Sequence, residues 1–275
     1  MHEQNITFIG AGNMAHSLIG GLVADGFPAT RLRAADPDAD RRRDLEARWS
    51  VKCFGKNLDA AADAQVIVLA VKPQLVSTVA RDLSPRVTSS SAMLISVAAG
   101  IRSADIARWT GGDPAIVRVM PNTPALLGCG ASGLFGNAAA SRSQRETAEA
   151  IMRAVGVTVW LDDESELDAV TAVSGSGPAY FFLLMELIEK QAVQLGLPAE
   201  AASILTLQTA LGAARMAIEN EESVGELRRR VTSPGGTTEA ALKVLAEPAF
   251  ADTLNRALES ARRRATELAD EFGKA

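Results

Sequence analysis

The sequence predicts a doubly wound α/β domain followed by an all-helical domain. Up to about residue 160, short apolar runs alternate with helical stretches, and from Leu167 onward no strand pattern recurs while alanine becomes frequent. Strand–helix alternation at this spacing is typical of a parallel sheet covered by helices. We therefore predict two domains, residues 1–162 and residues 163–275.

The predicted strands are mostly continuous apolar runs, which is typical of parallel strands buried on both faces. They are Ile6–Ile9, Leu32–Ala35, Val51–Phe54, Val66–Val71, Met93–Val97, Ile116–Met120 and Val157–Leu161. The helices predicted between them include Asn13–Asp25, Ala39–Arg48, Gln74–Leu83 and Ser143–Val155. In the second domain, Gly196-Leu197-Pro198 separates two long helices, because glycine ends helices and proline can begin them.

Composition and charge exclude several functions. The 275 residues are 47% hydrophobic and 22% charged, with a net charge of −5 and no broad basic surface, so we expect no nucleic-acid partner. The longest apolar runs, such as Val66–Val71, predict no membrane span. The N-terminus carries no signal-peptide pattern, which predicts a cytoplasmic protein. Cys53 and Cys129 are too few for a disulfide framework.

Histidine is equally scarce. His2 and His16 both lie near the N-terminus. Metal sites and Ser-His-Asp hydrolysis both need histidine beside acidic or nucleophilic partners. We therefore predict no metal site and no serine-hydrolase chemistry.

A glycine-rich turn follows the first predicted strand. Ile6–Ile9 runs into G-x-G-x-x-A, in which Gly10 permits a tight turn, Gly12 allows close backbone approach and Ala15 permits close helix–strand packing. The helix that begins here presents free N–H groups to phosphate. The motif in this position predicts a dinucleotide site.

The end of the second strand leaves the cofactor's identity open. Asp36 stands where an acidic residue commonly bonds the ribose 2′-hydroxyl and favours NAD. Arg41, Arg42 and Arg43 follow closely and could face a 2′-phosphate instead, or form a solvated helix face.

Two further strands end in polar loops at the same predicted edge of the sheet. Val66–Val71 leads into Lys72-Pro73, and Ile116–Met120 leads into Pro121-Asn122-Thr123-Pro124. Ligands of open α/β sheets bind beyond the carboxyl ends of strands. We therefore expect Lys72 and Asn122 near the cofactor.

Two hydroxyl-rich, glycine-rich loops open helices in the second domain. They are Val173–Tyr180 and Val231–Thr238. Such loops can bind a carboxylate through backbone N–H groups, although serine and threonine also serve simply as helix caps.

These motifs together resemble the pyrroline-5-carboxylate reductase family over essentially the whole chain. The matching segments are FIGAGNMA at Phe8–Ala15, AVKP at Ala70–Pro73, VRVMPNTP at Val117–Pro124, SGSGPAY at Ser174–Tyr180 and VTSPGGTT at Val231–Thr238. The resemblance implies reduction of 1-pyrroline-5-carboxylate to L-proline by hydride transfer from NAD(P)H. It also implies a homodimer joined by helices of the second domain, often assembled as a ring of dimers.

The resemblance further implies the site residues. Thr238 would hydrogen-bond the ring nitrogen of the substrate, and Ser233 would hold its carboxylate. The remaining substrate-site residues implied are Glu221, Ser176, Gly177, Pro178, Ala179, Gly235, Gly236 and Thr237. The cofactor-site residues implied are Gly10, Ala11, Gly12, Asn13, Met14, Asn57, Ala70, Val71, Lys72 and Pro73. The family usually prefers NADPH, so NADP is the expected cofactor. NAD is the alternative, because an aspartate at position 36 favours NAD.

The scarcity of acid–base groups fits imine reduction. A cyclic imine can be protonated before hydride arrives, so the protein needs chiefly to hold and align it. A 3-hydroxyacid or 6-phosphogluconate-type dehydrogenase resembles this architecture but carries a lysine where this chain has Phe181. A dinucleotide-binding sensor without catalysis is the other alternative, and it leaves the loop at Ser233–Thr238 without a purpose.

Overall fold

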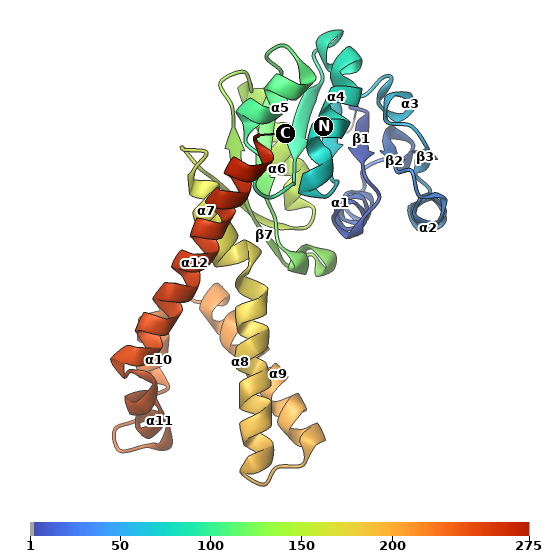
Figure 1. Cartoon of the computed structure of the whole chain (residues 1–275). Coiled ribbons are helices and arrows are strands. Elements are labelled where there is room, and N and C mark those ends of the chain that lie inside the picture. Colours follow the sequence, from blue (N-terminus) through green and yellow to red (C-terminus); the bar gives the residue numbers. More distant parts are fainter. Residues whose placement is uncertain (1–2, 275) are drawn as a thin grey trace. The chain divides into compact units, whose positions relative to one another are not determined.

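The chain folds into one eight-stranded sheet followed by helices, in a computed structural model that describes residues 3–274 (Figure 1). His2 lies outside the described residues. The strands are β1 (Ile6–Ile9), β2 (Leu32–Ala35), β3 (Lys52–Phe54), β4 (Val66–Leu69), β5 (Met93–Ser96), β6 (Ile116–Met120), β7 (Gly130–Gly136) and β8 (Gly156–Trp160). No strand occurs among the described residues beyond Trp160, which confirms the predicted class.

Helices connect and follow the strands. Those before residue 177 are α1 (Asn13–Ala24), α2 (Ala39–Trp49), α3 (Asn57–Ala61), α4 (Pro73–Thr88), α5 (Ser103–Thr110), α6 (Arg142–Arg153) and α7 (Glu166–Val170), with short turns η1 (Ala29–Arg31), η2 (Thr123–Leu127) and the π-helical η3 (Thr171–Gly175). Those after it are α8 (Gly177–Gln194), α9 (Ala199–Glu219), α10 (Val224–Arg230), α11 (Thr237–Leu245) and α12 (Pro248–Phe272). As predicted, Gly196-Leu197-Pro198 separates two long helices.

The sheet has the order β3-β2-β1-β4-β5-β6-β7-β8, and its first six strands are parallel. Side chains of each central strand alternate between two cores. Phe8 and Val68 pack with α1 and α6 on one face, whereas Ile9 and Leu69 pack with α3, α4 and α5 on the other. Burial on both faces explains why these strands read as continuous apolar runs.

Strand β7 was not predicted, because three glycines are unusual in a strand. It pairs antiparallel with β6 and parallel with β8. A Cβ on Gly133 would lie 2.8 Å from a methyl carbon of Val170, and one on Gly130 would lie 2.8 Å from the carbonyl oxygen of Val155. The glycines thus allow neighbouring backbone and side chains to approach this strand closely.

Contacts divide the chain into two compact units. The first comprises the chain up to Ser176 together with the end of α12 from Ser260, and the second comprises Gly177–Glu259. This differs from the predicted division after residue 162, which marks where the strands end. The end of α12 joins the first unit because Arg102 pairs with Asp270 at 2.6 Å and Phe272 packs on the core beneath α4 and α5.

Two helical stretches, Glu166–Gln194 and Ala199–Glu219, have the length and apolar composition of a membrane span, and 11% of an apolar 18-residue stretch in each is buried within the chain. The absence of a membrane span therefore stays a prediction. It rested on uninterrupted apolar runs, whereas these helices include scattered polar residues. Soluble core helices and helices covered by a second subunit share this composition.

Candidate dinucleotide site

A cavity of about 1490 Å³ opens at the carboxyl ends of β1, β2 and β4. It lies within the first unit of the chain. Ten of the twelve predicted cofactor residues line it: Gly10, Ala11, Gly12, Asn13, Met14, Asp36, Asn57, Ala70, Val71 and Lys72. The fold therefore brings four separate segments of the chain to one cavity, three of them at the ends of β1, β2 and β4, as the strand order of a Rossmann fold requires.

The two glycines of the turn have different structural duties. Gly10 has φ +101°, and a Cβ there would lie 2.6 Å from the carbonyl oxygen of Ala70, which directly follows the neighbouring strand β4. Gly12 has φ −84°, and nothing lies within 4 Å of the position of a Cβ. Gly10 is required by the fold of the turn. Gly12 leaves open space where a ligand can approach the backbone.

The N-terminus of α1 suits an anionic group. Gly12 occupies the cap position without a side chain, and the first turn holds no acidic residue. The first N–H groups of a helix have no partner within the helix, and the helix dipole is positive at this end. The open approach at Gly12 and this uncapped helix together fit the diphosphate of a dinucleotide.

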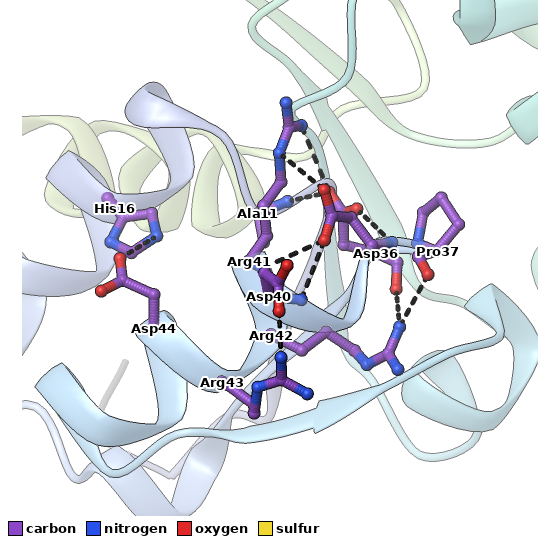
Figure 2. Close-up of polar contacts among 10 residues, drawn as sticks. Ala11, His16, Asp36, Pro37, Asp40, Arg41, Arg42, Arg43 and Asp44 are labelled. Atoms are coloured by element: carbon purple, nitrogen blue, oxygen red, sulfur yellow. Dashed lines mark hydrogen bonds and ion pairs between the residues drawn. The ribbon is translucent and has the colours of Figure 1, made fainter.

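Asp36 is buried at the end of β2, with 6% of its surface exposed. One carboxylate oxygen accepts the N–H of Ala11 at 2.9 Å, and the other accepts the N–H of Asp38 at 2.9 Å (Figure 2). The side chain therefore ties the end of β2 to the glycine-rich turn.

His16 points toward Asp44 of α2, with Nε2 and Oδ2 3.6 Å apart (Figure 2). Burial lowers the pKa of His16 below its usual range, and the charge of Asp44 opposes this shift. Burial therefore favours the uncharged imidazole, and His16 and Asp44 both line the cavity.

Several cavity residues were missed by sequence reasoning. They share one face of α2 or one face of α4, at spacings of three or four residues: Asp40, Asp44 and Arg48, and Leu75, Thr78, Val79 and Asp82. The helical spacing in the sequence places each of these groups on one face of its helix. The sequence alone does not show which face of each helix meets the cavity.

Two predicted cofactor residues do not line this cavity. Pro73 is the first residue of α4, where its missing N–H costs no helical hydrogen bond. Asn122 uses its side chain within the protein: Oδ1 accepts the N–H of Ala131 at 2.9 Å, and Nδ2 donates to the carbonyl of Ser174 at 3.2 Å.

The first predicted substrate loop is a π-helical turn inside a long helical stretch. Helix α8 begins at Gly177, but η3 immediately precedes it, and the N–H of Ser176 donates to the carbonyl of Thr171 at 2.8 Å. The expectation of a free helix N-terminus is therefore corrected. Pro178 explains the π turn, because a proline cannot donate to the carbonyl four residues before it and its ring displaces that turn of helix. Ala179 follows in the first turn of α8.

The second predicted substrate loop belongs to the second unit of the chain and is exposed. Gly235 has φ +72°, and the N–H of Gly236 donates to the carbonyl of Ser233 at 3.0 Å. Gly236 caps α11 and has no side chain, so the hydroxyls of the loop are not spent on capping that position. Thr237 and Thr238 are the first two residues of α11, and both are exposed.

Glu221 is exposed in the segment between α9 and α10. Among the described residues, no group of three or more histidine, cysteine, aspartate or glutamate side chains is placed to hold a metal ion.

The sheet order, glycine-rich turn and cavity define a dinucleotide-binding α/β protein with an appended helical unit. A family model described as pyrroline-5-carboxylate reductase dimerisation matches residues 164–268, and one described as NADP oxidoreductase, coenzyme F420-dependent, matches residues 5–100. A pyrroline-5-carboxylate reductase of Pseudomonas aeruginosa is 51% identical over 274 residues, covering 100% of both chains. This chain belongs to the pyrroline-5-carboxylate reductase family.

Solved structures agree. A pyrroline-5-carboxylate reductase from Coxiella burnetii is 44% identical and superposes with a TM-score of 0.93, covering 97% of this chain and 98% of the other. The Plasmodium falciparum pyrroline carboxylate reductase, solved with NADP bound, is 28% identical with a TM-score of 0.86, covering 98% and 99%.

Proposed function

We propose that this protein reduces 1-pyrroline-5-carboxylate to L-proline with NADPH. The observation that carries the proposal is the cavity around Gly10–Met14, in a chain related over its full length to reductases of this name. The bound dinucleotide would supply a hydride to the carbon of the C=N bond. The chain's own residues would hold the substrate so that this carbon lies against the nicotinamide ring.

The cofactor would lie along the glycine-rich turn. The N–H groups at the start of α1 would hold its diphosphate, and Asn57 would lie near the adenosine ribose. The NADP bound in the Plasmodium falciparum relative supports NADP as the cofactor, with NAD as the alternative to be tested.

The substrate would be held by the loop that precedes α11. Ser233, Gly235, Gly236 and Thr237 would bind the carboxylate, and Thr238 would hydrogen-bond the ring nitrogen. The carboxylate would replace the present partners of two N–H groups, which are Glu239 for Gly235 and the carbonyl of Ser233 for Gly236. Ser176, Gly177, Pro178, Ala179 and Glu221 would complete the walls. An exposed loop with hydroxyls not used for capping supports this role.

The helical unit would form a dimer. Ten large apolar residues of α8 and α9 are each at least 47% exposed in the single chain: Phe181, Phe182, Leu183, Leu184, Leu187, Ile188, Ile204, Leu205, Leu207 and Leu211. A surface this apolar needs a partner. The dimerisation model spans both helices, which favours a second copy over a membrane.

The assembly is testable by mass. We propose a homodimer, further assembled as a ring of dimers, in the cytoplasm. Light scattering after size-exclusion chromatography in buffer without detergent should give a multiple of the dimer mass. A protein that stays soluble only in detergent would instead support a membrane role for α8 and α9.

The activity is tested by the loss of reduced-nicotinamide absorbance with purified protein and 1-pyrroline-5-carboxylate. We expect substrate-dependent oxidation of NADPH, and the rate with NADH gives the cofactor preference. Oxidation of neither, despite measurable cofactor binding, would contradict the reductase and favour a sensor or a different imine substrate.

A further inference from the structure

Asp36 and the arginines that follow it decide between the two cofactors, and the structure separates their roles. A carboxylate at the end of the second strand commonly accepts the ribose 2′-hydroxyl and repels a 2′-phosphate. Here one oxygen of Asp36 already accepts the N–H of Ala11 and the other accepts the N–H of Asp38. Through these two bonds the carboxylate supports the glycine-rich turn, and a bond to the ribose would use the remaining lone pairs of its oxygens.

Two of the three arginines are committed elsewhere. Nη1 of Arg42 donates to the carbonyl of Asp36 at 2.6 Å and to that of Pro37 at 3.0 Å. Arg43 pairs with Asp40, and its side chain is 71% exposed. Neither Arg42 nor Arg43 lines the cavity.

Arg41 is placed differently. It lines the cavity, and its guanidinium lies 3.8 Å from a carboxylate oxygen of Asp36 and 3.7 Å from one of Asp38 (Figure 2). These distances are ionic contacts beyond hydrogen-bond length. A guanidinium has five donors, so it can bind a phosphate while remaining beside a carboxylate. Its charge also offsets the repulsion between Asp36 and an incoming phosphate.

We propose that Arg41 binds the 2′-phosphate of the cofactor and thereby selects NADPH, while Asp36 is a positioning residue for the glycine-rich turn. The proposal rests on the proposed function, because it assigns the adenosine end of the same cofactor site. It explains how a chain with an aspartate at this position binds a 2′-phosphorylated dinucleotide.

The test compares Arg41→Gln with Arg43→Gln, which removes the same charge from the adjacent residue outside the cavity. Affinities are measured on the full-length protein with NADPH and NADH, and with adenosine 2′,5′-bisphosphate and 5′-AMP. Because a hydrogen bond to a charged group contributes about 1.5–3 kcal/mol, Arg41→Gln should weaken NADPH and the bisphosphate about ten- to hundredfold. NADH and 5′-AMP should change less than about threefold in Arg41→Gln, and Arg43→Gln should leave all four ligands unchanged.

Lys56 also lines the cavity, as do Arg48 and Lys72, and it is exposed, so it is one competing phosphate ligand. A selective loss of NADPH affinity in Lys56→Gln with none in Arg41→Gln would overturn the proposal. Equal loss of both dinucleotides in Arg41→Gln would overturn it as well, since Arg41 would then act on a part common to both cofactors.

The Asp36→Asn variant tests whether Asp36 is a positioning residue for the glycine-rich turn. As a positioning residue it should weaken NADPH and NADH by a similar factor, because the turn loses part of its support. A fall in NADH affinity with a rise in NADPH affinity would show that Asp36 bonds the ribose directly and would overturn the assignment.

If the wild-type protein binds neither dinucleotide, both the cofactor site and this proposal are wrong. If it binds both but does not oxidise NADPH with 1-pyrroline-5-carboxylate, only the proposed reaction fails.

Discussion

The side-chain amide of Asn122 donates a hydrogen bond to the main-chain carbonyl of Ser174, with Nδ2 and O 3.2 Å apart. That carbonyl lies four residues before Pro178, which has no N–H to donate to it. Asn122 therefore supplies a donor that the helix lacks at its π turn. Its other amide atom holds the start of β7 through Ala131, so one side chain joins three segments.

Replacing Asn122 by alanine should lower the free energy of unfolding by about 1–3 kcal/mol, because the carbonyl of Ser174 and the N–H of Ala131 lose their partner. Urea unfolding measures this. The matched control is Asn220→Ala, which removes a single bond to the carbonyl of Met216 at an exposed helix end and should change stability by less than about 0.5 kcal/mol. Equal losses in the two variants would contradict the linking role.

The two glycines of the turn should respond oppositely to alanine. Gly10→Ala should lower the free energy of unfolding by about 3 kcal/mol, because φ is +101° and the Cβ would meet the carbonyl oxygen of Ala70. Gly12→Ala should leave stability unchanged within about 1 kcal/mol, since its φ is −84° and the space is open. It should nevertheless weaken cofactor binding, because a methyl group would occupy the path of the diphosphate. Urea unfolding and NADPH titration of both variants check this, and an unfolded Gly12→Ala would contradict it.

Thr238→Ala should lower kcat about a hundredfold by removing a hydrogen bond to the ring nitrogen in the transition state. Affinity for NADPH should not change, and Thr238→Ser should retain much of the activity because it keeps the hydroxyl. Thr253→Ala serves as the control, since that hydroxyl bonds only the carbonyl of Ala249 within an exposed helix. If Thr238→Ala loses NADPH affinity instead, the division into separate cofactor and substrate segments is wrong.

Cys53 should make stability fall at high pH. Burial, with a smaller contribution from the charge of Glu46, raises the pKa of the Cys53 thiol from 9.0 to about 12. Between these two values the folded protein keeps the proton that the unfolded chain has lost, so folding stability decreases as pH rises through this window and is unaffected below it. Urea unfolding at pH 8 and at about pH 10.5 should show a smaller decrease in Cys53→Ala than in the wild type.

The same shift predicts a difference in reactivity. The thiolate is the reactive form, so iodoacetamide at pH 9 should modify the exposed Cys129 well before Cys53. Mass spectrometry of the labelled peptides measures this order. Equal rates would show that Cys53 titrates normally in the folded protein.

The central sheet was predictable because its pattern is local. Ile6–Ile9, Leu32–Ala35 and Ile116–Met120 are strands with the predicted bounds. Their apolar runs are continuous because both faces are covered, and glycine or proline punctuates their ends. Helix ends are less well defined by the sequence, and the predicted α2 ends one residue before the observed end at Trp49.

Strand β7 and the hydrogen-bond partner at the π turn were not predictable from local pattern. Gly130 and Gly133 disfavour a strand in isolation, and only the close approach of Val155 and Val170 explains them. Pro178 accounts for the π turn locally, but the donor that satisfies the carbonyl of Ser174 comes from Asn122, which is distant in sequence. Tertiary contacts decide both features.

By itself, the sequence determined the class of the fold, the dinucleotide turn and the family, because periodicity and short motifs act over a few neighbouring residues. Only the tertiary structure decided what individual polar groups do. In the folded protein the carboxylate of Asp36 accepts the N–H of Ala11, and Arg42 donates to backbone carbonyls. Arg41 lines the cavity. A side chain's hydrogen-bond partners come from segments that folding brings together, and three adjacent arginines are equivalent until those partners are in place.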